Sequence, residues 1–137
     1  MHGSPSFRIG EEGERSTRSS ARYARGMTLD EVMEACAAFP AVELTYPFGP
    51  ETPVFKVVGK MFAALSTGAR TFVTLKSDPE DARALVHEFD AVTPGYHMNK
   101  KHWISVDFSD ERVPTEDLIR ASYDLVVAGL PKAERPR

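Results

Sequence analysis

The sequence predicts an α+β fold, a single domain in which helices pack on an antiparallel sheet. Three observations predict it. Apolar residues recur at helical spacing after Thr28, after Ser77 and after Pro114, and each place has a helix-starting signal. Residues 42–76 instead alternate apolar and polar side chains between short turns. The order helix, four strands, helix, short strands, helix is typical of helices packed on an antiparallel sheet.

Each predicted helix has its own boundary signals. Thr28 and Glu31 form a capping box at the start of the first helix, and Pro40 ends it. Met27 is placed to pack on Val32 as a hydrophobic staple. The second helix is expected to begin at Ser77-Asp78-Pro79, and its buried stripe consists of Ala82, Leu85, Val86 and Phe89. The third helix opens at Pro114 and stops before Pro131, with one face marked by Leu118, Ser122, Leu125 and Val126.

The strands are expected to form antiparallel hairpins. The first alternates over 42–48 up to a cluster of Pro and Gly, and the next two cover 54–58 and 61–65. Gly59-Lys60 is expected to join them as a type II′ turn, which needs glycine in its first central position. A second hairpin turns through 66–69 into a strand over 71–76, and a short strand follows over 103–108.

Length and composition indicate one globular domain. The chain has 137 residues, 42% of them hydrophobic, and single cores span about 100–150 residues. No apolar run approaches the roughly 18 residues of a membrane helix, and no secretory signal is visible. The single cysteine, Cys36, excludes an internal disulfide and a multi-cysteine metal site. We therefore expect a cytoplasmic protein without a metal or cofactor.

The charge is unevenly distributed. Residues 1–26 carry five arginines and three glutamates, a net charge of +2. Because the whole chain has a net charge of −3, residues 27–137 carry −5. We expect 1–26 to be a disordered tail, because it has no apolar periodicity, and 27–135 to be the folded domain. Met27 is expected to be the true start of the chain. The acidic balance requires that any nucleic acid be bound by a local basic patch.

The most informative segment is Pro94-Gly95-Tyr96-His97-Met98-Asn99-Lys100-Lys101-His102-Trp103. Lysines contact phosphates, and aromatic rings stack on bases. Candidate phosphate contacts are Lys100 and Lys101, extended by the hairpin lysines Lys56, Lys60 and Lys76. The remaining candidates for contacts with bases or sugars are Tyr96, His97, Asn99 and His102.

Ordered motifs along the chain resemble the MmcQ/YjbR family of small bacterial proteins. They are Pro47-Phe48-Gly49, Phe55-Lys56-Val57 with Gly59-Lys60-Met61-Phe62-Ala63, Leu75-Lys76 with Asp78-Pro79-Glu80, the segment 94–103, and Ser122-Tyr123-Asp124-Leu125-Val126-Val127 before Leu130-Pro131. The resemblance covers 27–135. It implies a CyaY/frataxin-like fold and a DNA-binding role through a double-wing surface. Two departures are Ile104-Ser105, where the family often has Asn-Thr, and Gly129, where a lysine is common.

Other interpretations of the same residues remain open. Lysines on edge strands and turns also serve solubility, and Asn99 also stabilises a turn through its own backbone. An alternative function is a small-molecule pocket under the loop, lined by Tyr96, His97, Trp103 and Tyr123. Core packing is the expected role of Trp103, and Tyr123 either faces this pocket or packs beneath the loop.

Metal and enzyme chemistry are poorly supported. His97 and His102 lack a third ligand for zinc. The acids Asp30, Glu31 and Glu34 suit an iron site less well than helix capping, and they also offer an acidic surface for a protein partner. No catalytic motif is recognisable, so we expect a protein that is not an enzyme.

Overall fold

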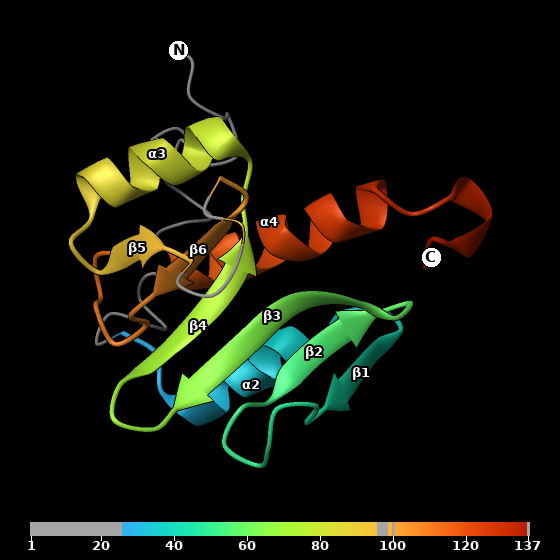
Figure 1. Cartoon of the computed structure of the whole chain (residues 1–137), viewed down its shortest axis with the longest axis horizontal. Coiled ribbons are helices and arrows are strands. Elements are labelled where there is room, and N and C mark those ends of the chain that lie inside the picture. The colour runs from blue at the N-terminus through green and yellow to red at the C-terminus, as the bar shows by residue number, and fades with distance from the viewer. Residues whose placement is uncertain (1–25, 96–98, 100, 137) are drawn as a thin grey trace.

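The computed structural model describes residues 26–95, 99 and 101–136, and these form a six-stranded sheet with three α-helices (Figure 1). The strand order is β1–β2–β3–β4–β6–β5, and every neighbouring pair is antiparallel. This confirms the predicted α+β class. The elements in chain order are α2 (Leu29–Ala37), β1 (Val42–Thr45), β2 (Val54–Val57), β3 (Lys60–Thr67), β4 (Thr71–Lys76), α3 (Pro79–Glu88), β5 (Val92–Pro94), β6 (Trp103–Val106), α4 (Thr115–Ala128) and the 3-10 helix η3 (Lys132–Glu134).

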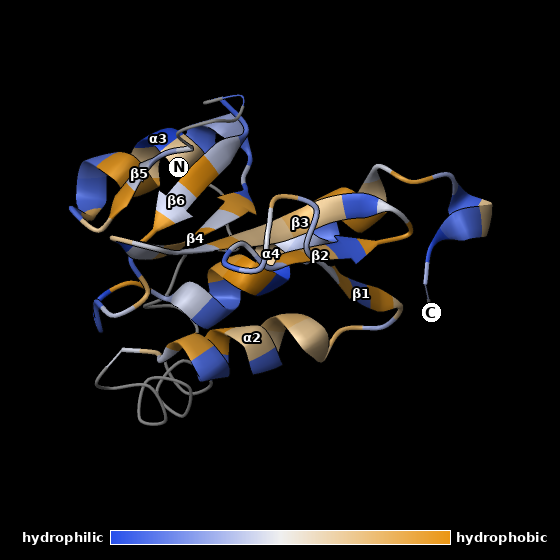
Figure 2. Ribbon diagram, turned by 60° about the horizontal axis from the view of Figure 1, so that its bottom comes forward, coloured by the Kyte–Doolittle hydropathy of each residue, from blue (hydrophilic) through white to orange (hydrophobic). Residues whose placement is uncertain are grey.

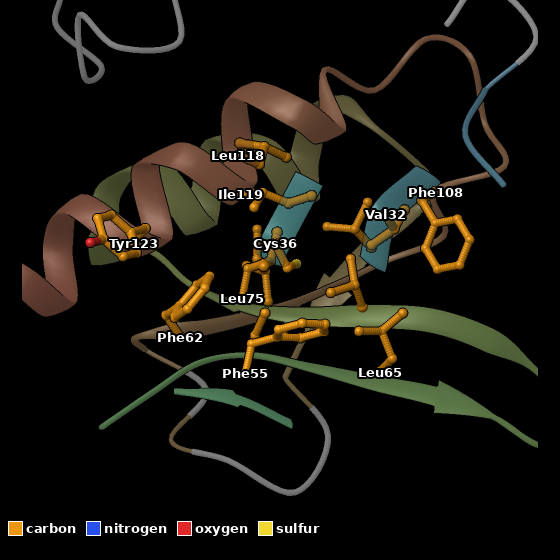
Figure 3. Packing of buried hydrophobic residues seen from close by; sticks show 14 of the residues in the cluster. Val32, Cys36, Phe55, Phe62, Leu65, Leu75, Phe108, Leu118, Ile119 and Tyr123 are labelled. Carbon is orange, nitrogen blue, oxygen red and sulfur yellow. The ribbon is translucent and has the colours of Figure 1, made fainter. Parts of the chain in front are cut away.

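One face of the sheet forms the core with the helices. In the register, Leu65, Val73, Val106 and Val92 are successive cross-strand partners, so their side chains share a face. All four belong to one buried apolar cluster, together with residues of α2, α3 and α4. Figure 3 shows residues of α2 and α4 meeting those of β2, β3 and β4 in this cluster. Residues that alternate with them, such as Thr74 and Ser105, point to the opposite face.

The predicted helix starts are confirmed. In α2 the Thr28 amide donates to Glu31 Oε1 at 2.9 Å, and the Glu31 amide donates to Thr28 Oγ1 at 3.2 Å, which is the expected capping box. Asp78 caps α3, because its Oδ1 accepts a hydrogen bond from the Glu80 amide at 2.9 Å. Pro79 follows in the first turn, as expected.

The C-terminal end of α4 is held by a residue outside the helix. No basic residue lies in its last turn. Instead, the Arg135 guanidinium donates from Nη2 to the Ala128 carbonyl oxygen at 2.9 Å and from Nε to that of Leu130 at 3.0 Å. A positive charge at this end stabilises the helix, because the unpaired carbonyl groups there carry partial negative charge.

Two predictions about the hairpin region were wrong. The β2–β3 turn consists of Val58-Gly59, not Gly59-Lys60, and its φ angles of 49° and 77° indicate type I′ in place of type II′. Lys60 already belongs to β3, opposite Val57. The first strand ends at Thr45, so Tyr46 and Phe48 lie beyond it and are exposed. The turn hydrogen bond from the Gly49 amide to the Tyr46 carbonyl oxygen ends the extended backbone there.

Among the described helices, none has both the length and the apolar character that a segment crossing a membrane requires.

Candidate nucleic-acid interface

Lys76 and Trp103 lie side by side on the face of the sheet opposite the core. They are direct Cα partners across β4 and β6, so their side chains project from the same face. The next pair along, Leu75 and Ile104, is buried in the core cluster, which places Lys76 and Trp103 on the other face. Both side chains are half-buried. The pair combines a cation with an aromatic ring at the end of two adjacent strands.

Lys56 joins this face from β2. Its neighbours in the chain, Phe55 and Val57, are fully buried in the core, so the Lys56 side chain points the opposite way. Lys60 is exposed at the tip of the β2–β3 hairpin, but it is the cross-strand partner of buried Val57, so its side chain projects from the core face and does not join the face of Lys56 and Lys76. Cross-strand pairing places Lys56 opposite Glu43 on β1. Four lysines of the sheet and loop make no ion pair with another described residue: Lys56, Lys60, Lys76 and Lys101.

Gly95 holds the start of the loop against Trp103. The Gly95 amide donates to the Trp103 carbonyl oxygen at 2.8 Å. A Cβ atom at position 95 would lie 2.8 Å from Trp103 Cβ and 3.1 Å from its carbonyl carbon. Glycine is therefore required for close approach of the two segments. The Pro94-Gly95 pair marks this position in the sequence, but its role is a contact between strands rather than a turn.

Backbone hydrogen bonds fix the other end of the loop. Asn99 Oδ1 accepts a hydrogen bond from the Lys101 amide at 3.0 Å, and the Asn99 carbonyl oxygen accepts one from the His102 amide at 3.0 Å. The side-chain oxygen of Asn99 thus stabilises the turn, as one of the two interpretations predicts. Lys101 is exposed and His102 is half-buried. The remaining predicted loop contacts, Tyr96, His97 and Lys100, lie outside the described residues.

Tyr123 packs in the core. Its ring stacks on Phe39 with centroids 4.6 Å apart, and it meets Phe62 edge-on at 5.2 Å. Its hydroxyl donates to the Pro40 carbonyl oxygen at 2.6 Å. Burial, together with the nearby Asp124 carboxylate, raises the pKa of Tyr123. These contacts agree with the packing interpretation and leave Tyr123 on the α2 side of the molecule, where Figure 3 shows it beside Phe62.

A cavity of about 1040 Å³ lies on the sheet between the β3–β4 turn and the segment after β6. Neither Trp103 nor Tyr123 lines it, so it is distinct from the pocket predicted under the loop. Its charged wall residues are Arg70, Asp90 and Asp107. One oxygen of the Asp107 carboxylate, Oδ1, already accepts two hydrogen bonds within the protein, from the Ser109 amide at 3.1 Å and from the Ser109 hydroxyl at 2.6 Å.

Two further groups were candidates for chemistry. Within the described residues, no three His, Cys, Asp or Glu side chains are placed to hold a metal ion together. Cys36 is fully buried on α2, and burial raises the pKa of its thiol to about 12. The thiolate that a nucleophile needs is therefore unfavourable at neutral pH.

Charges are divided between the two layers of the fold. Among the described helices, α2, α3 and α4 carry three acidic residues each, and α3 and α4 add one arginine each. The strands carry three lysines, Lys56, Lys60 and Lys76, and one acid, Glu43. Figure 2 shows strongly hydrophilic residues on the outer sides of α2 and α3. The helix layer is therefore acidic and the strand layer basic, despite the net charge of −3.

Comparisons with known proteins agree on one family. The YjbR family model matches residues 37–125. The uncharacterized protein YbdF of Escherichia coli O157:H7 is 48% identical over 102 residues, which are 72% of this chain and 83% of YbdF. The uncharacterized protein YjbR of Escherichia coli K12 is 33% identical over 113 residues, which are 80% of this chain and 95% of YjbR.

Solved structures have the same fold. The Deinococcus radiodurans protein DR2400, described by its DUF419 domain, is 38% identical with a TM-score of 0.72, over 81% of this chain and 87% of that one. A Pseudomonas syringae protein, 23% identical with a TM-score of 0.62 over 72% of this chain and 98% of that one, supports the fold alone. Sequence and fold together show that the chain belongs to the YjbR family.

Proposed function

We propose that this protein is a cytoplasmic DNA-binding module, not an enzyme, and that it contacts phosphates through the strand layer. The separation of charge between the two layers carries the proposal. An acidic helix layer is repelled by a polyanion, while Lys56 of β2 and Lys76 of β4 project from the opposite face of the sheet, where the polyanion would lie. The interface is therefore local, as the net charge of the chain requires.

The Lys76–Trp103 pair is the centre of the proposed interface. The lysine neutralises a phosphate and releases condensed counterions, while the neighbouring indole stacks on an unpaired base or packs against a sugar. Lys101 extends the contacts on the loop side, and Lys56 extends them on β2. Beyond the Ala63–Leu75 pair, β3 and β4 separate (Figure 1). The two arms of the sheet on either side of this opening correspond to the two wings of the proposed surface.

Fluorescence anisotropy of labelled duplex and single-stranded DNA, titrated with the full chain at several salt concentrations, tests the proposal. We expect micromolar affinity that weakens as salt rises. The double variant Lys76→Gln/Lys101→Gln should lower the slope of log K against log salt by about one to two units. The matched control Arg83→Gln/Lys132→Gln removes two exposed cations outside the sheet and should bind like the original chain. Absence of binding at low salt would overturn the proposal.

Trp103 offers a second, independent readout. It is the only tryptophan of the chain, so intrinsic tryptophan emission reports on this position alone. Stacking on a base should quench the emission in proportion to the bound fraction measured by anisotropy. Emission that stays constant while anisotropy rises would move the contact away from the Lys76–Trp103 pair.

The cavity beside β5 and β6 supports a second candidate function, the binding of a small polar molecule. Its volume of about 1040 Å³ suits a small ligand. Arg70 and Asp90 offer charges of both signs, and Phe72 offers an aromatic surface. Thermal unfolding with nucleotides, amino acids and sugars tests this function. A rise in Tm that is lost in Arg70→Gln but kept in Lys76→Gln would favour the cavity over the DNA interface.

A further inference from the structure

The large exposed apolar side chains of the described residues all lie between positions 44 and 58. Leu44 is 42% exposed, Tyr46 48%, Phe48 73% and Val58 41%. They lie on β1, just after it, and in the β2–β3 turn beside its start. β1 is one of the two edge strands of the sheet (Figures 1 and 2). Apolar side chains scattered singly over a surface need no explanation, but a group gathered along one edge indicates an interaction surface.

The outer edge of β1 has free hydrogen-bonding groups. In the described sheet β1 pairs with β2 on one side only. Edge strands are usually protected from further pairing by lysine, proline or inward-pointing charges. The sequence of β1 is Val-Glu-Leu-Thr, which contains neither lysine nor proline. Glu43 is its only charged residue. The strand is therefore open to pairing with an added strand.

We propose that β1 pairs antiparallel with β1 of a second copy of this chain, about a two-fold axis that passes beside Leu44. The axis is perpendicular to the sheet, so it keeps each side chain on its own face. Leu44 then lies opposite Leu44 of the second copy, and Val42 lies opposite Tyr46. Leu44 and Val42 are cross-strand partners of the buried Phe55 and Val57, so these apolar pairs extend the core face of the sheet.

The same register suits the polar residues of β1. Glu43 lies opposite Thr45 of the second copy, so the two carboxylates do not face each other directly. Like charges placed opposite each other would be unfavourable. The antiparallel direction also brings the Tyr46–Phe48 end of one copy towards the Val58 end of the other, which covers exposed apolar residues at both ends.

Neighbouring symmetric registers fit less well. Centring the axis on Glu43 would oppose the two carboxylates and extend the pairing to Ala41, whose φ of 62° is incompatible with a strand. Centring it on Thr45 would extend the pairing to Pro47, which has no amide hydrogen for the ladder. Registers centred between two residues would bring opposite faces together. Leu44 is thus the best centre.

The expected product is a weak dimer with one continuous sheet. A short strand pair with a few apolar contacts lies at the small end of specific interfaces, below about 1,200 Å². Because the axis is perpendicular to the sheet, both copies present Lys76 and Trp103 on the same side of the dimer. This proposal does not depend on DNA binding, since its tests measure assembly alone.

Sedimentation velocity of the full chain, from low micromolar to millimolar concentrations, tests the dimer. The mass should rise towards twice the 15.2 kDa of one chain. Leu44→Lys should keep the protein monomeric, because it places two ammonium groups opposite each other at the axis. Ala84→Lys adds the same charge on exposed α3 and should dimerise normally. A chain that stays monomeric at every concentration would overturn the proposal.

Disulfide trapping tests the register. Opposite Cα atoms in an antiparallel pair lie about 4.5–5.5 Å apart, within the range for a disulfide. Leu44→Cys should therefore oxidise rapidly to a covalent dimer, whereas Glu43→Cys, displaced by two residues from its copy, should cross-link slowly. Native Cys36 does not interfere, because it is fully buried. Equal rates for the two variants, or faster trapping of Glu43→Cys, would contradict the register.

Discussion

The Ser122 hydroxyl of α4 donates a hydrogen bond to the Phe62 carbonyl oxygen of β3 at 2.5 Å. The same oxygen atom of Ser122 accepts a hydrogen bond from the Lys76 amide of β4 at 2.8 Å. Phe62 and Lys76 would form the next pair after Ala63 and Leu75 if the two strands continued together. Ser122 therefore replaces a direct backbone hydrogen bond at the point where β3 and β4 separate.

Ser122→Ala should destabilise the fold by about 1–3 kcal/mol, because it leaves a buried carbonyl and an amide without a partner. Urea unfolding measures the loss. Thr71→Val, which removes an exposed hydroxyl on β4 and keeps the branched side-chain shape, is the control and should change the free energy of unfolding little. If Ser122→Ala were as stable as the original chain, the two hydrogen bonds of Ser122 to β3 and β4 would contribute nothing to the free energy of unfolding.

Gly95→Ala should also destabilise the protein, because the added methyl group would collide with Trp103 and force the two segments apart. We expect a loss of about 1–3 kcal/mol, in the range of other overpacked sites. Trp103 emission should shift to longer wavelength as its surroundings become more solvated. Gly68→Ala is the matched control, since nothing lies within 4 Å of a Cβ atom there. Unchanged emission and stability would argue against the close contact.

Val58→Asn should stabilise the protein. Val58 adopts a φ of 49° at the first position of a type I′ turn, a conformation that disfavours a β-branched residue. Relief of this strain should raise the free energy of unfolding by about 1 kcal/mol. The urea midpoint should rise with an unchanged m value. Val58→Ala, which keeps a side chain without asparagine's preference for this region, should gain less. A fall in stability with asparagine would contradict the turn assignment.

Stability should fall at alkaline pH because of Cys36. Its thiol titrates near the ordinary pKa of 9.0 in the unfolded chain and near 12 in the folded one. A group with a raised folded-state pKa contributes fully below its unfolded pKa, and the contribution is lost as pH rises. The free energy of unfolding should therefore fall between pH 9 and pH 12 by up to about 1.4 kcal/mol per pH unit.

Cys36→Ala provides the comparison for this pH dependence. The variant should be less stable at neutral pH, because the substitution leaves a small cavity. Between pH 9 and pH 12 its free energy of unfolding should fall less steeply with pH, because the thiol no longer contributes. Tyr123 contributes in the same direction in both proteins, since its pKa is also raised. Urea unfolding across this pH range measures the two slopes. Identical slopes would mean that the Cys36 thiol titrates alike in the folded and unfolded chains.

The sequence alone determined the helix starts and the class of fold. Thr28 with Glu31, and Asp78 with Pro79, act within one helical turn, so their effect is encoded locally. Alternation of apolar residues identified the core face of the central strands for the same reason. The hairpin turn was missed because glycine satisfies either of two turn types, and only the pairing of Val57 with Lys60 decides between them.

Tertiary structure decided which candidate residues lie together. Lys76 and Trp103 are far apart in the chain, and only the β4–β6 register makes them neighbours. The need for glycine at position 95, the bridge of Ser122 between β3 and β4, and the packing of Tyr123 on Phe39 likewise depend on contacts between distant segments. Local sequence fixes backbone propensity within a few residues, whereas strand register and side-chain packing follow from the free energy of the whole folded chain.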